Sequence, residues 1–322
     1  MSVHRPSRPT GMRRRGCRIS ADKGASHGSP RSSALGPAAW SSGRRRGPGR
    51  GRQEWVAEVT DRAMHRAYNT EPCVPSTSGD AGKWMTPSTA PLAIALPGTF
   101  CAPAIFDGLG HALAGHCRLR ALSWMTDADA YRIGSLAEWV AGRIRAGSDE
   151  PVVLIGHSTG GAIGLQTAAR HPELLRGLVL INTGPHMRGH GDVDTLIDAI
   201  TTDGVEAMTR RVLRRSFKVP PPAAELERFL AYGSAVPTRA AVEALTSQRD
   251  TDLTAALPTI HVPVAVVHGR HDPVRTTADA AAMTQTFPNA TLHTVDAGHS
   301  PMYECPDAVR TVVVELLTRT AR

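Results

Sequence analysis

The sequence predicts an α/β fold, built on a mostly parallel sheet with helices on both faces. Two observations predict it. From Pro91 onward, short and almost wholly apolar runs alternate with helical patterns. Strands that read as continuous apolar runs are typical of a parallel sheet that is buried on both faces. Between residues 185 and 258 only helical patterns occur, which indicates a helical insertion in that sheet.

Composition restricts the class of protein. The length of 322 residues fits one large α/β domain with additional segments. No apolar run approaches the ~18 residues that a membrane span needs, so no membrane partner is expected. The five cysteines are scattered and form no C-x-x-C pair, which indicates neither a zinc site nor a disulfide framework. Five reduced thiols favour a cytoplasmic location.

Positive charge is concentrated in a basic arm, predicted to be disordered over residues 1–85. Residues 1–52 carry 13 basic residues and one acidic residue, whereas the remaining 270 carry 24 basic and 28 acidic residues. The stretch "GRRRGPGRGR" at 43–52 cannot bury enough apolar surface to offset the entropy of ordering. Arginine-rich arms can bind nucleic acid. A plain disordered tail, or a start codon placed too early, explains the composition better, so no nucleic-acid partner is expected.

The folded domain is expected over residues 86–322. Strands are predicted at 92–96, 152–155, 178–182, 264–269 and 291–295. Helices are predicted at 135–147, 159–170 and 307–319, from the spacing of their apolar residues. The insertion at about 185–258 follows a strand end. We therefore expect it to form a helical lid over the carboxyl edge of the sheet, where ligands bind in such folds.

The stretch "VVLIGHSTGG" places a serine in a turn between a strand and a helix. Such a turn raises the Ser158 hydroxyl above the sheet edge, beside the N–H groups of a helix N-terminus. Gly156 and Gly160 are needed because a side chain at either position would collide with the neighbouring strand and helix. The G-x-S-x-G pattern alone is a weak signal, and a simple tight turn is its alternative interpretation.

An acid and a histidine follow at later strand ends, in the order Ser, acid, His that this turn predicts. Asp272 ends "VAVVHGRHD" and His299 ends "TLHTVDAGH". Asp296 stays open as an alternative acid, although it fits a turn-capping role better. The other histidines weighed are His157, His268 and His271, expected to pack away from the chemistry, and His186 and His190, expected to line the pocket. The spacing in "HMRGHGD" does not support a metal site.

The motifs "GHSTGG", "HGRHDPV" and "DAGHSPMYECPDAV" make residues 91–320 resemble the α/β-hydrolase family. The resemblance implies a nucleophile at Ser158, a base at His299 and an orienting acid at Asp272. It also implies an oxyanion hole formed by the backbone N–H groups of Thr99 and Thr159, with no cofactor and no metal. The chain departs from the family in having "LPGTF" where members often carry His-Gly. It also departs in showing no convincing pair of antiparallel strands between residues 53 and 90.

The function expected from this resemblance is that of a serine hydrolase. It would cleave an ester, lactone or thioester of a small apolar acyl group through an acyl-enzyme, with a small acyl compound as its partner. A serine at position 158 argues against the family branches that use aspartate there. Two alternatives stay open: an acyltransferase or thioesterase of a biosynthetic pathway, and a hydrolase-like protein that binds a ligand without turnover.

Overall fold

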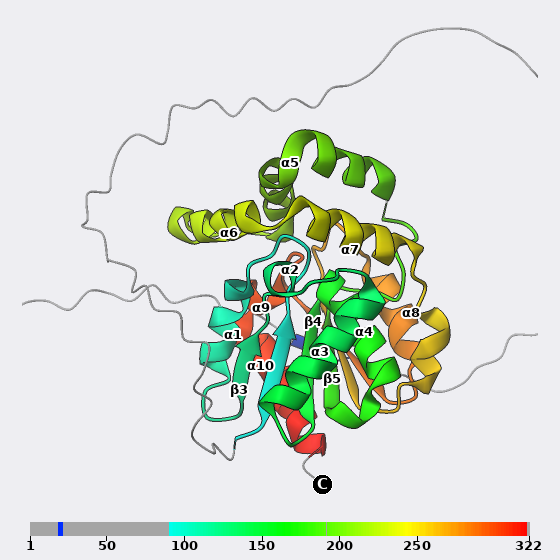
Figure 1. The fold of residues 1–322 in the computed structure, drawn as a ribbon. Helices are drawn as coiled ribbons and strands as arrows, with labels where there is room; N and C mark the ends of the chain where they lie inside the picture. Colours follow the sequence, from blue (N-terminus) through cyan, green and yellow to red (C-terminus); the bar gives the residue numbers. More distant parts are fainter. Residues whose placement is uncertain (1–18, 22–89, 191, 321–322) are drawn as a thin grey trace, which may run out of the picture. The chain divides into compact units, whose positions relative to one another are not determined.

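A seven-stranded sheet forms the centre of the folded domain (Figure 1). The computed structural model describes residues 19–21, 90–190 and 192–320. The strands are β1 (Ile19–Ala21), β2 (Leu92–Leu96), β3 (Arg118–Ala121), β4 (Val152–His157), β5 (Leu175–Ile181), β6 (Val264–Gly269) and β7 (Ala290–Val295). They lie in the order β1-β7-β6-β5-β4-β2-β3, and every pair is parallel except β1 with β7. The predicted parallel sheet is confirmed.

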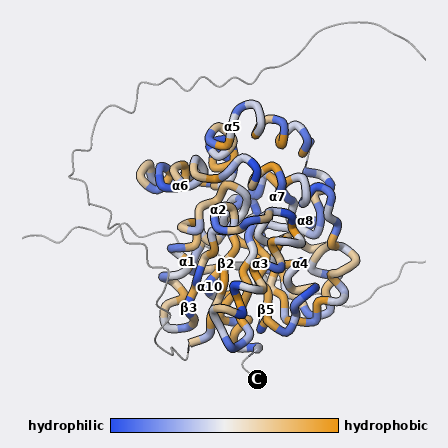
Figure 2. Tube along the Cα trace, in the orientation of Figure 1, coloured by the Kyte–Doolittle hydropathy of each residue, from blue (hydrophilic) through white to orange (hydrophobic). Residues whose placement is uncertain are grey.

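Helices cover both faces of the sheet, because successive strand residues point to opposite sides. Ile94 and Leu154 pack into a core on one face, while Ala93 and Val153 pack into a second core on the other. The first core receives residues of α3 (Ile133–Gly147), α4 (Thr159–Arg170) and α8 (Thr277–Thr286); the second receives residues of α1 (Asp107–Ala112) and α10 (Pro306–Thr320). Figure 2 shows the hydrophobic strands within this arrangement.

The two edge strands of the sheet, β1 and β3, were not predicted from the sequence. In β3 two of four residues are arginine, and such charged residues are common on edge strands because they oppose pairing with other chains. Of the arm predicted over residues 1–85, the structure describes only Ile19–Ala21, and these three residues form β1 against β7. The rest of that arm, and the segment 53–89 where two further strands were sought, lie outside the described residues.

The cysteines differ from the expectation of five reduced thiols. Cys101 and Cys117 are free and buried. Burial raises the pKa of Cys101 to about 12 and that of Cys117 to about 11, so both stay protonated. Cys305 is instead disulfide-bonded. Scattered cysteines predict pairing poorly, because the bond depends on the separation of their Cα atoms in the fold.

Three long helices form the predicted insertion above the sheet (Figure 1). They are α5 (Val193–Ser216), α6 (Ala223–Ala235) and α7 (Thr238–Asp250), and together they are called the lid here. A kink divides α5 at Gly204, whose φ is 84°. Across the described ranges, no helix is both long and apolar enough to pass through a bilayer.

The strand order determines where a site can form. From β2 the chain crosses to β3 on one side, and β4 then pairs on the other side of β2. Such a reversal leaves a crevice at the carboxyl ends of the two strands. The loop with Thr99 follows β2, and Ser158 follows β4. The topology therefore brings the two predicted loops together below the lid.

We expect Gly160→Ala to lower the free energy of unfolding by about 1–3 kcal/mol or more, as overpacking of a rigid core does. Its Cβ would lie 2.1 Å from the backbone oxygen of Leu96, and neither backbone can yield easily. The matched control is Gly142→Ala in α3, where a Cβ would meet nothing within 4 Å. This control should gain roughly 0.5–1 kcal/mol. Urea unfolding measures both, and equal effects of the two changes would contradict the packing argument.

Candidate active site

Ser158 occupies the sharp turn between β4 and α4, with φ of 53° and ψ of −120°. A positive φ is strained for a residue with a side chain, and such strain persists only where the surroundings hold it. Here the Ser158 N–H donates to the Ile181 carbonyl at 3.0 Å, and the Thr183 hydroxyl donates to the Ser158 carbonyl at 2.7 Å. A Cβ on Gly156 would lie 2.6 Å from the Gly160 oxygen, as the sequence predicted.

A buried carboxylate–imidazole pair lies beside this turn. His299 Nδ1 is 2.9 Å from Asp272 Oδ1, and the two side chains are 8% and 0% exposed. Burial alone would raise the pKa of Asp272, but the hydrogen bond and the charge of His299 lower it below its ordinary value. Asp272 is therefore ionised at neutral pH, and the imidazole proton resides on Nδ1.

Asp296, the alternative acid, is directed elsewhere. Its Oδ1 accepts from Lys218 Nζ at 2.6 Å and lies 2.7 Å from His271 Nε2. Half of its side-chain surface is exposed, and so is half of that of His271. The structure thus joins His299 to Asp272 and leaves Asp296 in a surface cluster of charges.

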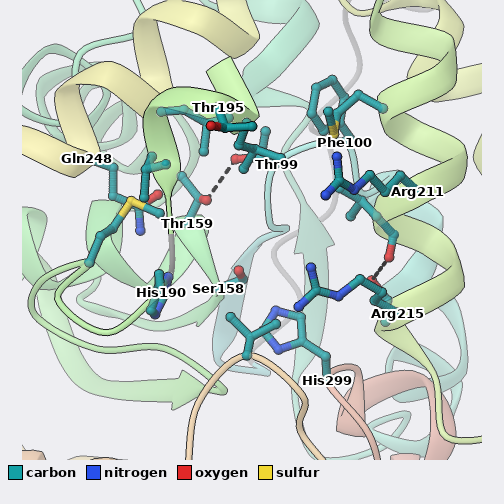
Figure 3. Close-up of a pocket in the computed structure, with 18 of the residues that line it drawn as sticks. Thr99, Phe100, Ser158, Thr159, His190, Thr195, Arg211, Arg215, Gln248 and His299 are labelled. Carbon is teal, nitrogen blue, oxygen red and sulfur yellow. Dashed lines mark hydrogen bonds between the residues drawn. The ribbon is translucent and has the colours of Figure 1, made fainter. Parts of the chain in front are cut away.

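Thr99, Ser158, Thr159 and His299 line one cavity of about 400 Å³ between the sheet edge and the lid (Figure 3). The hydroxyls of Thr99 and Thr159 are 2.7 Å apart. Within the described residues, the backbone N–H groups of these two threonines have no hydrogen-bond partner. Over the same residues, Ser158 Oγ makes no hydrogen bond to His299. Contacts of this kind often tighten only when substrate binds.

A match over most of the chain assigns the family. A family model described as the alpha/beta hydrolase family matches residues 73–312. The chain belongs to the alpha/beta hydrolase family.

Individual relatives of this hydrolase are distant. The 3-oxoadipate enol-lactonase 2 of Acinetobacter baylyi is 26% identical over 200 residues, which cover 60% of this chain and 74% of that protein. The pimeloyl-[acyl-carrier protein] methyl ester esterase of Aromatoleum aromaticum is 28% identical over 190 residues, 52% of this chain and 74% of that one. The solved enol-lactonase from Burkholderia xenovorans LB400 gives a TM-score of 0.61 at 26% identity, covering 71% and 92%.

Sequence reasoning missed Asn182, whose side chain holds the carboxylate of Asp272. Its Nδ2 donates to Asp272 Oδ2 at 2.8 Å and to the Gly298 carbonyl at 3.1 Å, and its Oδ1 accepts from the Gly269 N–H at 2.9 Å. Its φ is 45°, which asparagine tolerates better than most residues. Asn182 thereby ties the ends of β5 and β6 to the His299 loop. The available signal was a polar residue directly after the apolar run "LVLI".

His157 has a larger structural role than the sideways packing that the sequence predicted. Its ring is fully buried. Nδ1 accepts from the Gly98 N–H at 3.3 Å, and Nε2 lies 2.9 Å from the His299 carbonyl, to which it donates. Burial, followed by the charge of His299, lowers the pKa of His157 to about 3. A neutral ring thus joins the Thr99 loop to the His299 loop.

The remaining histidines divide between core, surface and pocket. His268 is buried in β6 and His271 is exposed, as expected. His190 lines the cavity; its Nε2 is buried with no hydrogen-bond partner among the residues described. Burial, then the charges of Arg275 and His299, lower the pKa of His190 to about 4, so it is neutral at pH 7. In the described part of the chain, no three His, Cys, Asp or Glu side chains are grouped to hold a metal.

We expect His157→Phe to weaken the loss of stability in acid. The pKa of His157 is about 3 when folded, against an ordinary value of 6.5. Between these pH values the unfolded chain binds a proton that the folded chain does not, so the free energy of unfolding falls as pH falls. Phenylalanine cannot take up this proton in the unfolded chain. The free energy of unfolding of the variant should therefore change less steeply with pH between pH 6 and pH 4, by up to about 1.4 kcal/mol per pH unit.

Urea unfolding of both proteins at pH 4, 5, 6 and 7.5 measures that slope. At pH 7.5 the variant should already be less stable by about 1–3 kcal/mol, because the buried Gly98 N–H loses its acceptor. The region above pH 7 is the internal control, since His157 is neutral there in both folded and unfolded chains. Identical slopes below pH 6 would show that His157 does not titrate on unfolding.

Proposed function

We propose that the protein is a serine hydrolase that cleaves an ester, lactone or thioester through an acyl-enzyme on Ser158. One observation carries the proposal: the buried Asp272–His299 pair, 2.9 Å apart, adjoins the cavity in which Ser158 is held at a strained φ. The names of the relatives support the same reaction class, because they include a lactonase and a methyl ester esterase.

In the first half of the reaction, Ser158 Oγ attacks the carbonyl carbon while its proton moves to His299 Nε2. A serine hydroxyl needs such a base at neutral pH. Ionised Asp272 keeps the other imidazole proton on Nδ1 and stabilises the imidazolium. The unpartnered N–H groups of Thr99 and Thr159 donate to the negative oxygen of the tetrahedral intermediate. When this intermediate collapses, His299 gives its proton to the leaving alcohol or thiol.

In the second half, water attacks the acyl-enzyme and its proton moves to His299 Nε2. The bond between the carbonyl carbon and Ser158 Oγ then breaks, and His299 returns the proton to Ser158. One water is consumed. An ester or thioester releases one acid and one alcohol or thiol, whereas a lactone gives a single hydroxy acid, because its leaving hydroxyl stays attached to the acyl chain. If an alcohol replaces water, the same steps transfer the acyl group, which is the alternative activity that the sequence leaves open.

The cavity favours a small acyl group with an apolar chain. Its volume of about 400 Å³ is at the lower end of the range for small-molecule sites. Apolar residues from the lid and from the strand-end loops form much of its wall: Phe100, Met187, Val193, Leu196, Met208, Val212, Leu245 and Val274. Such a wall stabilises methylene groups by removing them from water.

The direct test is Ser158→Ala. We expect kcat for 4-nitrophenyl valerate to fall on the order of 10⁶-fold, as it does when a triad loses its nucleophile. A fluorophosphonate probe should label the wild-type serine and leave the variant unlabelled. Circular dichroism controls for folding. A folded variant that keeps wild-type turnover would overturn the proposal, whereas labelling without turnover of any ester, lactone or thioester would favour the binding-protein alternative.

A second test compares the two candidate acids. In Asp272→Asn, the new NH₂ group must face a donor, because Asp272 accepts from Asn182 on one oxygen and from Val274 and His299 on the other. We expect kcat to fall about 10⁴-fold, the usual cost of losing the orienting carboxylate. The control Asp296→Asn changes an exposed carboxylate and should stay within about 2-fold of wild type. The reverse ranking would assign the acid to Asp296.

A further inference from the structure

Two arginines of the lid line the cavity that holds Ser158. Arg211 and Arg215 lie four residues apart in α5, so they project from the same face of the helix. Both belong to the cavity wall. Figure 3 shows their side chains directed from α5 into the cavity, with the Arg215 guanidinium on the side of Ser158 and His299.

Neither guanidinium has an ion-pair partner in the part of the chain that the structure describes. Over the described residues, no hydrogen bond or ion pair involves the Arg211 or Arg215 side chain, whereas nearby Arg210 pairs with Glu206 at 3.0 Å. The cavity wall contains one carboxylate, Asp192. Its two oxygens accept from the N–H and the hydroxyl of Thr195, at 3.0 and 2.6 Å. The wall therefore carries two positive charges and one negative charge, and within the described residues the carboxylate is hydrogen-bonded to Thr195 and to neither arginine.

Arg211 and Arg215 are both exposed residues at the cavity wall, so an anion bound there replaces water on their guanidinium groups. The Arg211 and Arg215 side chains alternate along α5 with Met208 and Val212, which also line the cavity. A guanidinium pairs best with carboxylate or phosphate, because its fixed N–H groups match two oxygens at once. An anion bound there would relieve the repulsion between the two arginines. It would also be held at a defined distance from the nucleophile.

We infer that Arg211 and Arg215 form an anion-binding subsite, and that the substrate carries a carboxylate or phosphate which they hold while its carbonyl lies at Ser158. This inference rests on the proposed function and specifies its substrate class. The anion has two possible sources: a carboxylate at the far end of an apolar acyl chain, or a phosphate in the leaving group of a thioester. The bidentate oxygen chemistry is the same for both.

The test compares two double variants of the same helix. Arg211→Gln with Arg215→Gln removes the cavity pair. Arg210→Gln with Arg214→Gln removes two exposed arginines with the same spacing and the same loss of charge, and neither lines the cavity. Four substrates form two matched sets. The esters are mono-4-nitrophenyl glutarate and neutral 4-nitrophenyl valerate; the thioesters are valeryl-coenzyme A and valeryl-N-acetylcysteamine, which lacks phosphate.

We expect the cavity variant to lose about 10- to 100-fold in kcat/KM for an anionic substrate, the usual range for losing hydrogen bonds to a charged group. The loss should occur mainly through KM. For the neutral substrate of each set, kcat/KM of the cavity variant should stay within about 2-fold of the wild-type value. The control variant should stay within the same range for all four substrates. A loss confined to glutarate assigns the subsite to an acyl carboxylate, and a loss confined to the coenzyme A thioester assigns it to a phosphate. Equal losses within each matched set, or no loss, would overturn the inference.

Binding without turnover separates this inference from the proposed function. Calorimetry of glutarate with Ser158→Ala should give a dissociation constant that rises about 10-fold or more when Arg211 and Arg215 are also replaced. If neutral esters are cleaved through Ser158 but the arginine pair does not discriminate charge, only the subsite is wrong. If Ser158→Ala keeps full turnover, the proposed function is wrong, whatever the arginine variants do.

Discussion

After the turn that holds Ser158, the first turn of α4 passes very close to the end of β2. A Cβ on Gly160 would lie 2.1 Å from the Leu96 oxygen. The same turn leaves only 2.6 Å between a Cβ on Gly156 and the Gly160 oxygen. Glycines at these two positions let strand and helix backbones meet, and the residue between them must then reverse the chain at a positive φ. Ser158 is held there by hydrogen bonds from and to its own backbone, which join it to the residues that end β5. The position of the Ser158 side chain above the sheet edge is therefore a consequence of backbone packing.

Polar side chains at the strand ends extend this constraint to the other loops. His157 joins the loop after β2 to the His299 loop, and Asn182 joins the ends of β5 and β6 to the same loop. Glu304 accepts from the Gly298 N–H and the Lys218 N–H, each at 2.7 Å, and so connects that loop to the segment after α5. Buried polar groups that are fully satisfied rigidify their surroundings. The imidazole of His299 is thus positioned by three side chains besides Asp272.

Sequence reasoning succeeded where local chemistry determined the structure. The apolar runs of β2 and β6 and the glycines around Ser158 act on their immediate neighbours, so these elements were predictable. The strand β3 was not, because two arginines on an edge strand conceal its apolar positions. Asn182 was not, because its contacts lie 87 to 116 residues away in the chain. The sequence already favoured Asp272 over Asp296, but the contact behind that choice needed the fold, since both follow strands and only Asp272 lies within hydrogen-bond distance of His299.

The lid was predicted as a helical insertion. Its sequence could not show which charged residues of α5 face the cavity, because that depends on the orientation of the helix. Four arginines lie at 210, 211, 214 and 215, and their spacing assigns them to two neighbouring stripes of α5. Arg211 and Arg215 line the cavity that Ser158 also lines, and they follow the kink at Gly204, where a φ of 84° interrupts the helix. A Cβ at Gly204 would meet no atom within 4 Å, so its conformation, rather than crowding, is what favours glycine there. In the proposed reaction the bond-breaking groups come from the strand ends of the sheet, whereas the proposed anion subsite lies on α5, which contributes none of Ser158, Asp272 and His299. A change in α5 can therefore alter the substrate while the chemistry at Ser158 stays the same.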